Sequence, residues 1–593
     1  MSALDITSTF ALFDDNLSGG GDLLLEGLCE TIVCHRADEV DAVFERIEAA
    51  RRRGQWVVIA ASFELGEALE PRLARAARPP GAPLMTAWVF SQATKMSPDR
   101  TAIAIDAALA GLDEHQRVAM VGGVHQTLDE NTYRDGVARI RTLIEAGDCY
   151  QVNYTFALRG HVLGESLALY AALRERQPVR YGAWVNHSQG CILSRSPELF
   201  VERTGQRLTC RPMKGTAPRE AGPEALASSE KDRAENVMIV DLIRNDLGRL
   251  APPGGVRVDS LLDVEAYPTL WQMTSTISAE PVEADLATLF RALFPCGSVT
   301  GAPKIRAMEI IRELEPEPRG LYCGALGWLS PDGDFRFSVP IRTLEADARG
   351  SFRCGLGSGI VADSEPAREW DECLLKGRFL TGLRPTFGLI ETLRCEPQSE
   401  APYPLLERHL ARLEASAGFF GFDCDAAAVR AALHAHAASL QGPHRVRLEL
   451  SPDGRLMLDG GPLAPLSEPV HVGLAATHLR SDDLLARHKT TARALYDAAL
   501  REATAAGLFD VLFFNERDEL VEGARSSLFV ECDDGALLTP PLTAGALDGV
   551  LRRDLIESGR AREAVIDRAR LNTARRVFVG NALRGLLRAT LSD

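Results

Sequence analysis

Two stretches of the chain each place a lysine in a setting suited to chemistry. One is His488-Lys489-Thr490-Thr491-Ala492-Arg493, followed by the largely apolar run Leu520-Val521-Glu522-Gly523-Ala524-Arg525-Ser526-Ser527-Leu528-Phe529. The other is Arg211-Pro212-Met213-Lys214-Gly215-Thr216-Ala217-Pro218-Arg219, a loop punctuated by proline and glycine. Because the two lysines lie far apart in the sequence, we expect two separate active sites.

The length and composition agree with a protein of several domains. A chain of 593 residues is too long for one hydrophobic core, and its 46% hydrophobic and 25% charged residues are ordinary for a soluble globular protein. No apolar run reaches the roughly 18 residues of a membrane span, and the start, Met1-Ser2-Ala3-Leu4-Asp5, does not resemble a secretory signal. We therefore expect a cytoplasmic protein that does not insert into membranes.

The net charge and the cysteine spacing argue against several classes of partner and site. A net charge of −16 argues against nucleic acid or anionic membranes as partners, because the overall field repels polyanions. Small anionic substrates are not excluded, because a local pocket of arginine and lysine can bind them despite the negative net charge of the chain. The twelve cysteines show no CxxC pair or metal-ligand spacing, which indicates reduced core residues.

Periodicity gives a coarse organisation. Apolar residues recur near 3.6 spacing over residues 131–146, which predicts a helix that ends at Gly147. Over residues 229–250 the apolar positions are nearly continuous, which predicts a deeply buried helix. A break at Gly382-Leu383-Arg384-Pro385 precedes a new strand-like run. We place one domain at residues 1–380 and a second at 386–593.

Paired carboxylates suggest a metal site in the first domain. Asp232 and Glu235 are three residues apart on one predicted helix, and Glu369 and Glu372 repeat this spacing on another. Such pairs suit Mg²⁺, which binds one or two carboxylate oxygens and keeps several waters. Solvated surface charge is the alternative, and spacing alone favours it.

The order of motifs in the first domain carries a family resemblance. Six stretches resemble, in this order, the chorismate-utilising enzymes: Gly147-Asp148-Cys149-Tyr150-Gln151-Val152-Asn153, Ser196-Pro197-Glu198-Leu199-Phe200, Pro212-Met213-Lys214-Gly215-Thr216, Met238-Ile239-Val240-Asp241-Leu242-Ile243-Arg244-Asn245-Asp246-Leu247, Gly297-Ser298-Val299-Thr300-Gly301-Ala302-Pro303-Lys304 and Gly355-Leu356-Gly357-Ser358-Gly359-Ile360-Val361-Ala362. The resemblance spans residues 1 to about 378 and is strongest to the aminodeoxychorismate synthases. It implies an α+β fold with two sheets.

The same resemblance implies roles for individual residues. Lys214 would add to C2 of chorismate while Glu198 acts as general acid on the departing C4 hydroxyl. Mg²⁺ would be bound by Glu235 and Glu372, with Asp232 and Glu369 acting directly or through water. Gln272 stands where anthranilate synthases carry a histidine associated with pyruvate loss. The substrate's carboxylates would be held by Thr300, Tyr322, Arg342, Lys376 and the amides of Gly357 to Gly359.

From Phe387 onward the chain resembles the fold-type IV pyridoxal-phosphate enzymes, and most strongly the 4-amino-4-deoxychorismate lyases. The resemblance implies a fold of two subdomains, with Lys489 as the Schiff-base lysine and Glu522 beside the pyridine nitrogen, where a carboxylate turns the ring into an electron sink. It also implies that the phosphate is held by Arg412, the amides of Val550 and Leu551 after Gly549, and the side chain of Asn581. Leu551 and Asn581 depart from the hydroxyl residues usual at these positions.

Together these features predict an enzyme with two activities. The first domain would convert chorismate and ammonia to 4-amino-4-deoxychorismate, and the second would release pyruvate to leave 4-aminobenzoate, on the way to folate. No glutaminase motif is visible, so a separate glutaminase subunit is expected, and a homodimer through the second domain is a further expectation. The alternatives are an anthranilate synthase-like enzyme joined to a fold-type IV aminotransferase, or a non-catalytic remnant in either half.

Overall fold

The computed structural model describes residues 5–74, 82–267, 270–532 and 535–592 of the chain. The chain forms two compact units, each described here by itself. The first comprises Met1–Leu112 and Val124–Leu383, and the second comprises Asp113–Gly123 and Arg384–Asp593. The short segment Asp113–Gly123 therefore groups with the second unit although it lies within the N-terminal part of the sequence.

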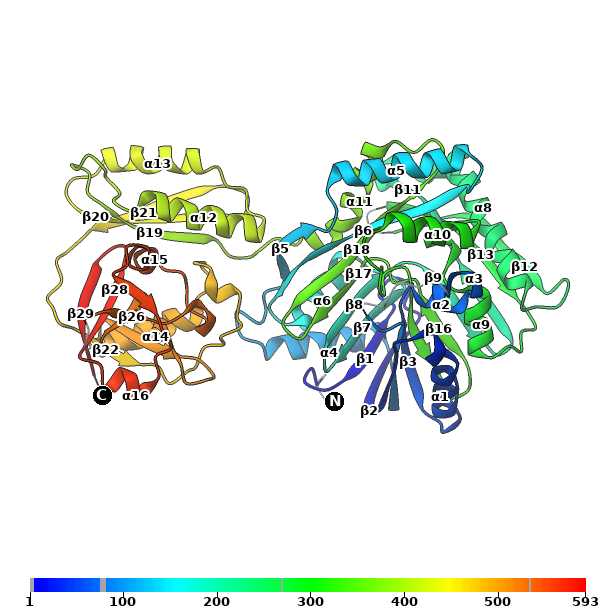
Figure 1. Cartoon of the computed structure of the whole chain (residues 1–593), viewed down its shortest axis with the longest axis horizontal. Helices are drawn as coiled ribbons and strands as arrows, with labels where there is room; N and C mark the ends of the chain where they lie inside the picture. The colour runs from blue at the N-terminus through cyan, green and yellow to red at the C-terminus, as the bar shows by residue number, and fades with distance from the viewer. Residues whose placement is uncertain (1–4, 75–81, 268–269, 533–534, 593) are drawn as a thin grey trace. The chain divides into compact units, whose positions relative to one another are not determined.

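The first unit is built on a network of antiparallel strands (Figure 1). The strands of this network are β1 (Phe10–Asp14), β2 (Asp22–Cys34), β3 (Trp56–Ala61), β4 (Met85–Met96), β5 (Met120–Gln126), β6 (Gln151–Leu163), β7 (Tyr181–His187), β8 (Gly190–Ser196), β9 (Leu199–Thr204), β10 (Arg207–Arg211), β11 (Met213–Pro218), β12 (Val256–Ala266), β13 (Leu270–Ala279), β14 (Gly301–Ala302), β15 (Ala325–Leu329), β16 (Phe335–Ser338), β17 (Thr343–Asp347) and β18 (Ser351–Ile360). Strand β5 begins in the segment that groups with the second unit, and its residues from Val124 onward belong to the first.

Pairing orders most of these strands into one continuous path. It runs β12-β13-β10-β9-β16-β15-β3-β4-β2-β1-β7-β8-β17-β18-β6-β14, and β11 also pairs with β13. One core cluster contains Val58 of β3 and Phe90 of β4 together with Val185 of β7 and Ile192 of β8. The path thus folds over so that its two halves face each other across apolar side chains. The two-sheet fold predicted for this part is confirmed.

Helices of the first unit cover the strands that carry the site. They are α1 (Val40–Arg52), α2 (Leu65–Leu69), α3 (Pro71–Ala74), α4 (Pro98–Ala110), α5 (Glu130–Glu145), α6 (Ser166–Arg176), α7 (Pro223–Ala227), α8 (Glu230–Gly248), α9 (Leu286–Leu293), α10 (Lys304–Leu314) and α11 (Pro366–Thr381). Helices α5, α10 and α11 pack on β6 and β18, whereas α8 packs on β11, β12 and β13 (Figure 1). Asp129 caps α5 by accepting from the Thr132 amide at 3.0 Å, and Ser229 caps α8 in the same way.

Both helices predicted from periodicity are present, and their ends agree within two residues. The prediction that the second is deeply buried was wrong in part. Ile239, Ile243 and Leu247 of α8 are buried, yet the Val237 side chain is 46% exposed. The reason is that α8 packs against the sheet with one face only, so the apolar residues on the opposite face meet solvent.

The second unit contains two sheets with their own helices (Figure 1). The small sheet has β19 (Leu389–Cys395), β20 (His444–Leu450) and β21 (Leu456–Pro462), against which α12 (Leu406–Phe420) and α13 (Ala426–Ala438) pack. The large sheet has the order β24-β23-β22-β29-β28-β25-β26-β27. Its strands are β22 (Val470–Leu474), β23 (Asp510–Phe514), β24 (Leu520–Gly523), β25 (Ser527–Glu531), β26 (Leu537–Thr539), β27 (Ala561–Glu563), β28 (Arg576–Asn581) and β29 (Gly585–Leu591), and its helices are α14 (Ala494–Ala505), α15 (Val550–Glu557) and α16 (Arg568–Asn572). The predicted two-subdomain fold is confirmed.

In the described part of the chain, none of the helices combines the length and the apolar character that crossing a bilayer requires.

Candidate active sites

Glu198 is a buried acid in the first unit. It follows β8 in the turn that leads to β9, and only 3% of it is exposed. The Ser298 hydroxyl donates to its Oε1 atom at 2.5 Å, and Cys296 Sγ lies 3.1 Å from the same hydroxyl. Burial raises the pKa of Glu198 to about 7, because the hydrogen bond from Ser298 and the nearby Lys214 offset only part of the loss of water. This carboxyl can therefore hold a proton near neutral pH.

Lys214 lies on β11 beside that acid. Gly215 follows it with φ of 84°, a left-handed conformation that glycine adopts without strain. Gln272 of β13 fixes this turn, since its Nε2 atom donates to the Gly215 carbonyl at 2.6 Å and its Oε1 atom accepts from Thr216 Oγ1 at 3.1 Å. Lys214 Nζ is 3.4 Å from where a Cβ at Gly359 would stand. The absence of that Cβ leaves the amine room beside β18.

A second side chain at this place was not assigned a role from the sequence. Gln151, at the start of β6, lies even nearer than Lys214 to the Cβ-free side of Gly359. It is 1% exposed, and neither its Nε2 nor its Oε1 atom has a hydrogen-bond partner among the described residues. A buried amide costs free energy when it is unpaired, so this one is available to a polar ligand. The sequence signal was its place in the Gly147–Asn153 motif.

The predicted metal-binding carboxylates come from two helices. Asp232 and Glu235 lie in the first turns of α8, and Glu369 and Glu372 lie in α11. Burial raises the pKa of Glu235, with Asp232 and Glu372 adding to the effect and Lys214 opposing it. Glu372 binds Lys376 Nζ at 2.7 Å. Asp232 packs against Gly215, with its Cβ 2.9 Å from where a Cβ of that glycine would stand.

This donor set fits Mg²⁺ in its chemistry. Glu235 and Glu372 approach closely enough for their like charges to interact, and hard carboxylate oxygens are the ligands Mg²⁺ prefers. Across residues 5–74, 82–267, 270–532 and 535–592, no group of three or more histidine, cysteine or acidic side chains forms a ready-made metal cage. Two carboxylates with waters completing the shell are the arrangement that these residues could offer.

The predicted substrate-binding residues have different surroundings. Lys376 Nζ donates to the Gly357 carbonyl at 3.0 Å. The Thr300 hydroxyl is used locally, since it donates to the Cys296 carbonyl at 2.7 Å. Tyr322 is buried with its ring against Gly355. Strand β17 pairs with β18 only as far as Cys354, so within the described chain no strand extends that pairing along the edge that carries Gly357 and Gly359.

Arg342 lies in the turn before β17. Its φ of 51° is unusual for a side chain with a Cβ, and its carbonyl accepts from the Arg195 amide at 3.0 Å. Burial lowers the pKa of its guanidinium, and Tyr267 offsets part of this effect. A partly buried cation of this kind is suited to a carboxylate ligand.

Lys489 of the second unit lies in a loop that is attached to β19. The Ile390 amide donates to the Lys489 carbonyl, and the Thr491 amide donates to the Gly388 carbonyl, both at 2.9 Å. Burial, together with the neighbouring Arg493 and Arg412, lowers the pKa of Lys489 to about 8, although the acids nearby oppose this change. More of this amine is therefore unprotonated at neutral pH than in an ordinary lysine, which favours a nucleophilic role.

Glu522 of β24 is a buried acid near Lys489. Its Oε1 atom accepts from the Tyr496 hydroxyl at 3.1 Å, and its Oε2 atom accepts from the Leu547 amide at 3.2 Å. Burial raises the pKa of Glu522 to about 7, while these hydrogen bonds and Lys489 act in the opposite direction. The two hydrogen bonds fix the carboxylate, which could then partner a ring nitrogen.

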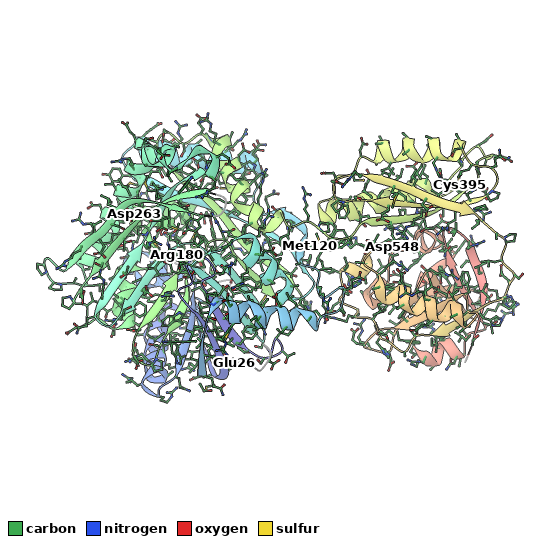
Figure 2. All side chains as sticks on the ribbon, turned by 180° about the vertical axis from the view of Figure 1, so that it is seen from behind. Glu26, Met120, Arg180, Asp263, Cys395 and Asp548 are labelled. Atoms are coloured by element: carbon green, nitrogen blue, oxygen red, sulfur yellow. The ribbon has the colours of Figure 1, made fainter. Side chains whose placement is uncertain are left out.

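Arg412 of α12 is held by a buried acid. Its Nε and Nη2 atoms donate to Glu391 at 2.8 and 2.6 Å, and His409 Nδ1 lies 2.6 Å from the same carboxylate. Although burial raises the pKa of Glu391, Arg412 and His409 lower it to about 2. The remaining guanidinium nitrogen, Nη1, donates to the Asp548 carbonyl at 3.2 Å, and Asp548 is labelled in Figure 2.

That contact places Arg412 beside the start of α15. The helix begins at Val550 with Gly549 as its N-cap, and no side chain among the described residues caps it. The amides of Val550 and Leu551 at a helix start have no partner within the helix and suit a phosphate. Because Leu547 contacts Glu522 and Asp548 contacts Arg412, the turn at 547–551 links the predicted ring-nitrogen and phosphate positions. The residues present therefore fit pyridoxal phosphate.

Two more residues lie near the predicted phosphate position: Asn581, and Ser527, which was not assigned a role from the sequence. Asn581 Nδ2 donates to the Arg525 carbonyl at 3.0 Å, and its Oδ1 atom accepts from the Arg584 amide, so this side chain is already engaged. Ser527 Oγ lies 2.6 Å from where a Cβ at Gly549 would stand. A hydroxyl beside the helix start could supply the phosphate donor that Leu551 lacks, and nothing in its local sequence distinguished Ser527 from its neighbour Ser526.

Comparisons with known proteins agree with this division. Residues 26–382 match the profile of the chorismate binding enzyme family, and residues 388–591 match that of amino-transferase class IV. The aminodeoxychorismate synthase component 1 of Klebsiella aerogenes is 44% identical over 253 residues, which cover 41% of this chain and 56% of the relative. The chain thus spans about half the length of the curated relatives it matches.

Two solved structures are also similar. Anthranilate synthase component I from Streptococcus pneumoniae is 23% identical, with a TM-score of 0.51 over 64% of this chain and 93% of that one, and shares the fold. A putative amino-acid aminotransferase from Mesorhizobium loti is 40% identical and aligns over 35% of this chain and 100% of its own, with a TM-score of 0.34. The first profile covers more than half of the sequence, and the chain belongs to the chorismate binding enzyme family.

Proposed function

We propose that this chain makes 4-aminobenzoate in two steps. The first unit joins ammonia to chorismate to give 4-amino-4-deoxychorismate, and the second unit releases pyruvate from that product. One observation carries the proposal: each unit brings a lysine together with a buried glutamate whose pKa is about 7, Glu198 near Lys214 and Glu522 near Lys489.

In the first step the Lys214 amine forms a bond to C2 of chorismate. Both double bonds of the ring diene shift, the C4–O bond breaks, and protonated Glu198 donates its proton so that water leaves. Ammonia then adds at C4, the Lys214–C2 bond breaks, and the amine is returned. Gln272 holds the turn that carries Lys214 during these changes.

Substrate and metal binding support this step. Glu235 and Glu372 would bind Mg²⁺, with Asp232 and Glu369 acting directly or through water. Bound Mg²⁺ would neutralise the ring carboxylate of chorismate. Thr300, Tyr322, Arg342, Lys376 and the backbone of Gly357 and Gly359 would orient the substrate's carboxylates.

In the second step Lys489 removes the proton from C4 of 4-amino-4-deoxychorismate. The C3–O bond then breaks, and the enolpyruvyl group leaves and takes up a proton to become pyruvate. Pyridoxal phosphate, when bound, supplies an electron sink for the carbon that loses the proton. Glu522 would face its pyridine nitrogen, and Arg412, Asn581 and the amides of Val550 and Leu551 would face its phosphate.

Three further expectations belong to this proposal. Ammonia would come from a separate glutaminase subunit, because the first unit resembles the component 1 relatives. The second unit would form a homodimer. The protein would act in the cytoplasm, where chorismate is used.

The test is to incubate the purified chain with chorismate, ammonium, Mg²⁺ and pyridoxal phosphate and to identify the products by mass and retention. We expect 4-aminobenzoate and pyruvate in equal amounts. A chelator should stop chorismate consumption while supplied 4-amino-4-deoxychorismate is still converted. Anthranilate as the product, or amino-group exchange with a 2-oxo acid in place of pyruvate release, would contradict the proposal and support the alternative pair of activities.

A further inference from the structure

The segment Asp113–Gly123 contacts the loop that carries Lys489. It follows α4 in the sequence and forms neither a helix nor a strand before Met120, which is labelled in Figure 2. His115 Nδ1 lies 2.6 Å from Asp483 Oδ2, and His115 Nε2 lies 2.8 Å from the Ala492 carbonyl. Residues 483 and 492 stand on either side of Lys489 in the sequence, so one imidazole bridges the two ends of the loop.

The hydrogen bonds that His115 makes to Asp483 and Ala492 are charge-assisted. A carboxylate and a carbonyl can only accept, so both ring nitrogens of His115 must donate, and the imidazole is a cation. The Asp483 carboxylate in turn accepts from the Leu485 amide at 2.9 Å, which fixes the turn leading into the lysine loop. Although burial lowers the pKa of His115, Asp483 raises it above its ordinary value.

Two more contacts support the same loop. The Glu114 carboxylate accepts from the Ala494 amide at 2.7 Å, at the start of α14, where a helix has unpaired amides. Gly122 packs against the ring of Phe419, and that ring stacks on His488 with centroids 4.5 Å apart. His488 directly precedes Lys489. The segment therefore contacts the loop directly before and after the lysine, and it reaches the residue beside the lysine through the ring of Phe419.

We propose that Asp113–Gly123 is a positioning element of the second active site, which holds the 483–494 loop so that the Lys489 amine stays in reach of cofactor and substrate. This inference rests on the proposed role of Lys489. It means that the second activity depends on residues supplied from within the N-terminal part of the sequence, and that residues 384–593 alone lack a part of their own site.

The test uses the full chain with His115→Ala and follows hydrogen exchange of peptides that cover residues 483–494, without cofactor. We expect these amides to exchange about tenfold faster, the size typical of losing charge-assisted hydrogen bonds. Pyridoxal phosphate should also dissociate about tenfold faster on dialysis, and pyruvate release from supplied 4-amino-4-deoxychorismate should slow, while chorismate consumption stays unchanged.

His478→Ala is the matched control, because His478 also pairs with an aspartate of the second unit, Asp518, but at 3.5 Å and with more exposed side chains. Glu114→Gln tests the helix-start contact and serves if His115→Ala does not fold. The proposal would be overturned if the hydrogen exchange of residues 483–494 and the rate of cofactor loss in both His115→Ala and Glu114→Gln were the same as in His478→Ala. Cofactor retention by Lys489→Ala would instead overturn the role of Lys489, whereas the exchange result would still stand.

Discussion

Two buried glutamates, one in each unit, have opposite pKa shifts because their neighbouring side chains differ. Glu198 accepts a hydrogen bond from one neutral hydroxyl, that of Ser298, and has Lys214 nearby, yet burial outweighs both and its pKa rises to about 7. Glu391 is met by Arg412 and His409, and its pKa falls to about 2. Burial raises the pKa of both carboxyls, so the direct hydrogen bonds from Arg412, together with His409, account for the difference. The first carboxyl can give a proton to a substrate, and the second is a fixed anion that positions an arginine.

The largest effect is expected for Glu198→Gln. An amide keeps the shape but cannot donate the proton that the leaving C4 hydroxyl requires, so amination should fall by roughly 10²- to 10⁴-fold. Formation of 4-aminobenzoate from supplied 4-amino-4-deoxychorismate should be unchanged, and chromatography of both reactions measures this. Amination within a few-fold of the unaltered chain would make Glu198 a structural acid like Glu391.

Glu391→Gln should lower the stability of the second unit. The change leaves the Arg412 guanidinium buried with a neutral partner, which typically costs about 3–5 kcal/mol. Urea unfolding followed by hydrogen exchange in α12 should show a lower midpoint for the second unit. Glu407→Gln, also on α12, breaks an exposed pair with Arg430 of α13 and is the control, since exposed pairs contribute little. A midpoint equal to that of the control would show that Arg412 does not need this anion.

The two acids should also give opposite dependences of stability on pH. The lowered pKa of Glu391 contributes stability that is present above about 4.5 and is lost as the pH falls towards about 2. Glu198 has a raised pKa, so the unfolded chain loses this proton near 4.5 and the folded chain keeps it to about 7; stability of the first unit should fall as pH rises through that window.

Unfolding midpoints of each unit at several pH values check these signs. Glu198→Gln should remove the fall between pH 4.5 and 7 in the first unit, and Glu391→Gln should flatten the acid limb of the second. The same slope in each variant as in the unaltered chain would assign the pH dependence to other groups.

The smallest effect is expected for Ser298→Ala. Its hydroxyl favours the ionised form of Glu198, so its removal should raise that pKa further, by about one unit or less. The alkaline limb of the amination rate should move upward by the same amount, which a pH profile of kcat/KM measures. A downward shift would show that Ser298 stabilises the protonated acid instead.

Local patterns predicted much of this molecule. Lys489 with Glu522, the helices at α5 and α8, and the strand after residue 386 each have a signal within a few residues of sequence, and the structure brings the first pair into one site. The roles of the site residues stay predictions.

Other features depend on contacts between distant residues and gave no local signal. Ser527 matters because it meets Gly549, and His115 because it meets Asp483, 368 residues away. The exposure of Val237 likewise follows from which face of α8 meets the sheet. Residue type and spacing do not encode such tertiary partners.

The place of β29 in the large sheet has a consequence for synthesis of the chain on the ribosome. It is the last strand of that sheet in the sequence, yet it lies inside the sheet, between β22 and β28. Its pairing with β22 is parallel and joins residues more than 100 positions apart. While residues 576–591 are still inside the ribosome, the edge of β22 that later pairs with β29 is unpaired and can pair with other chains. A nascent chain of this protein is therefore expected to need chaperone protection until its final strand emerges.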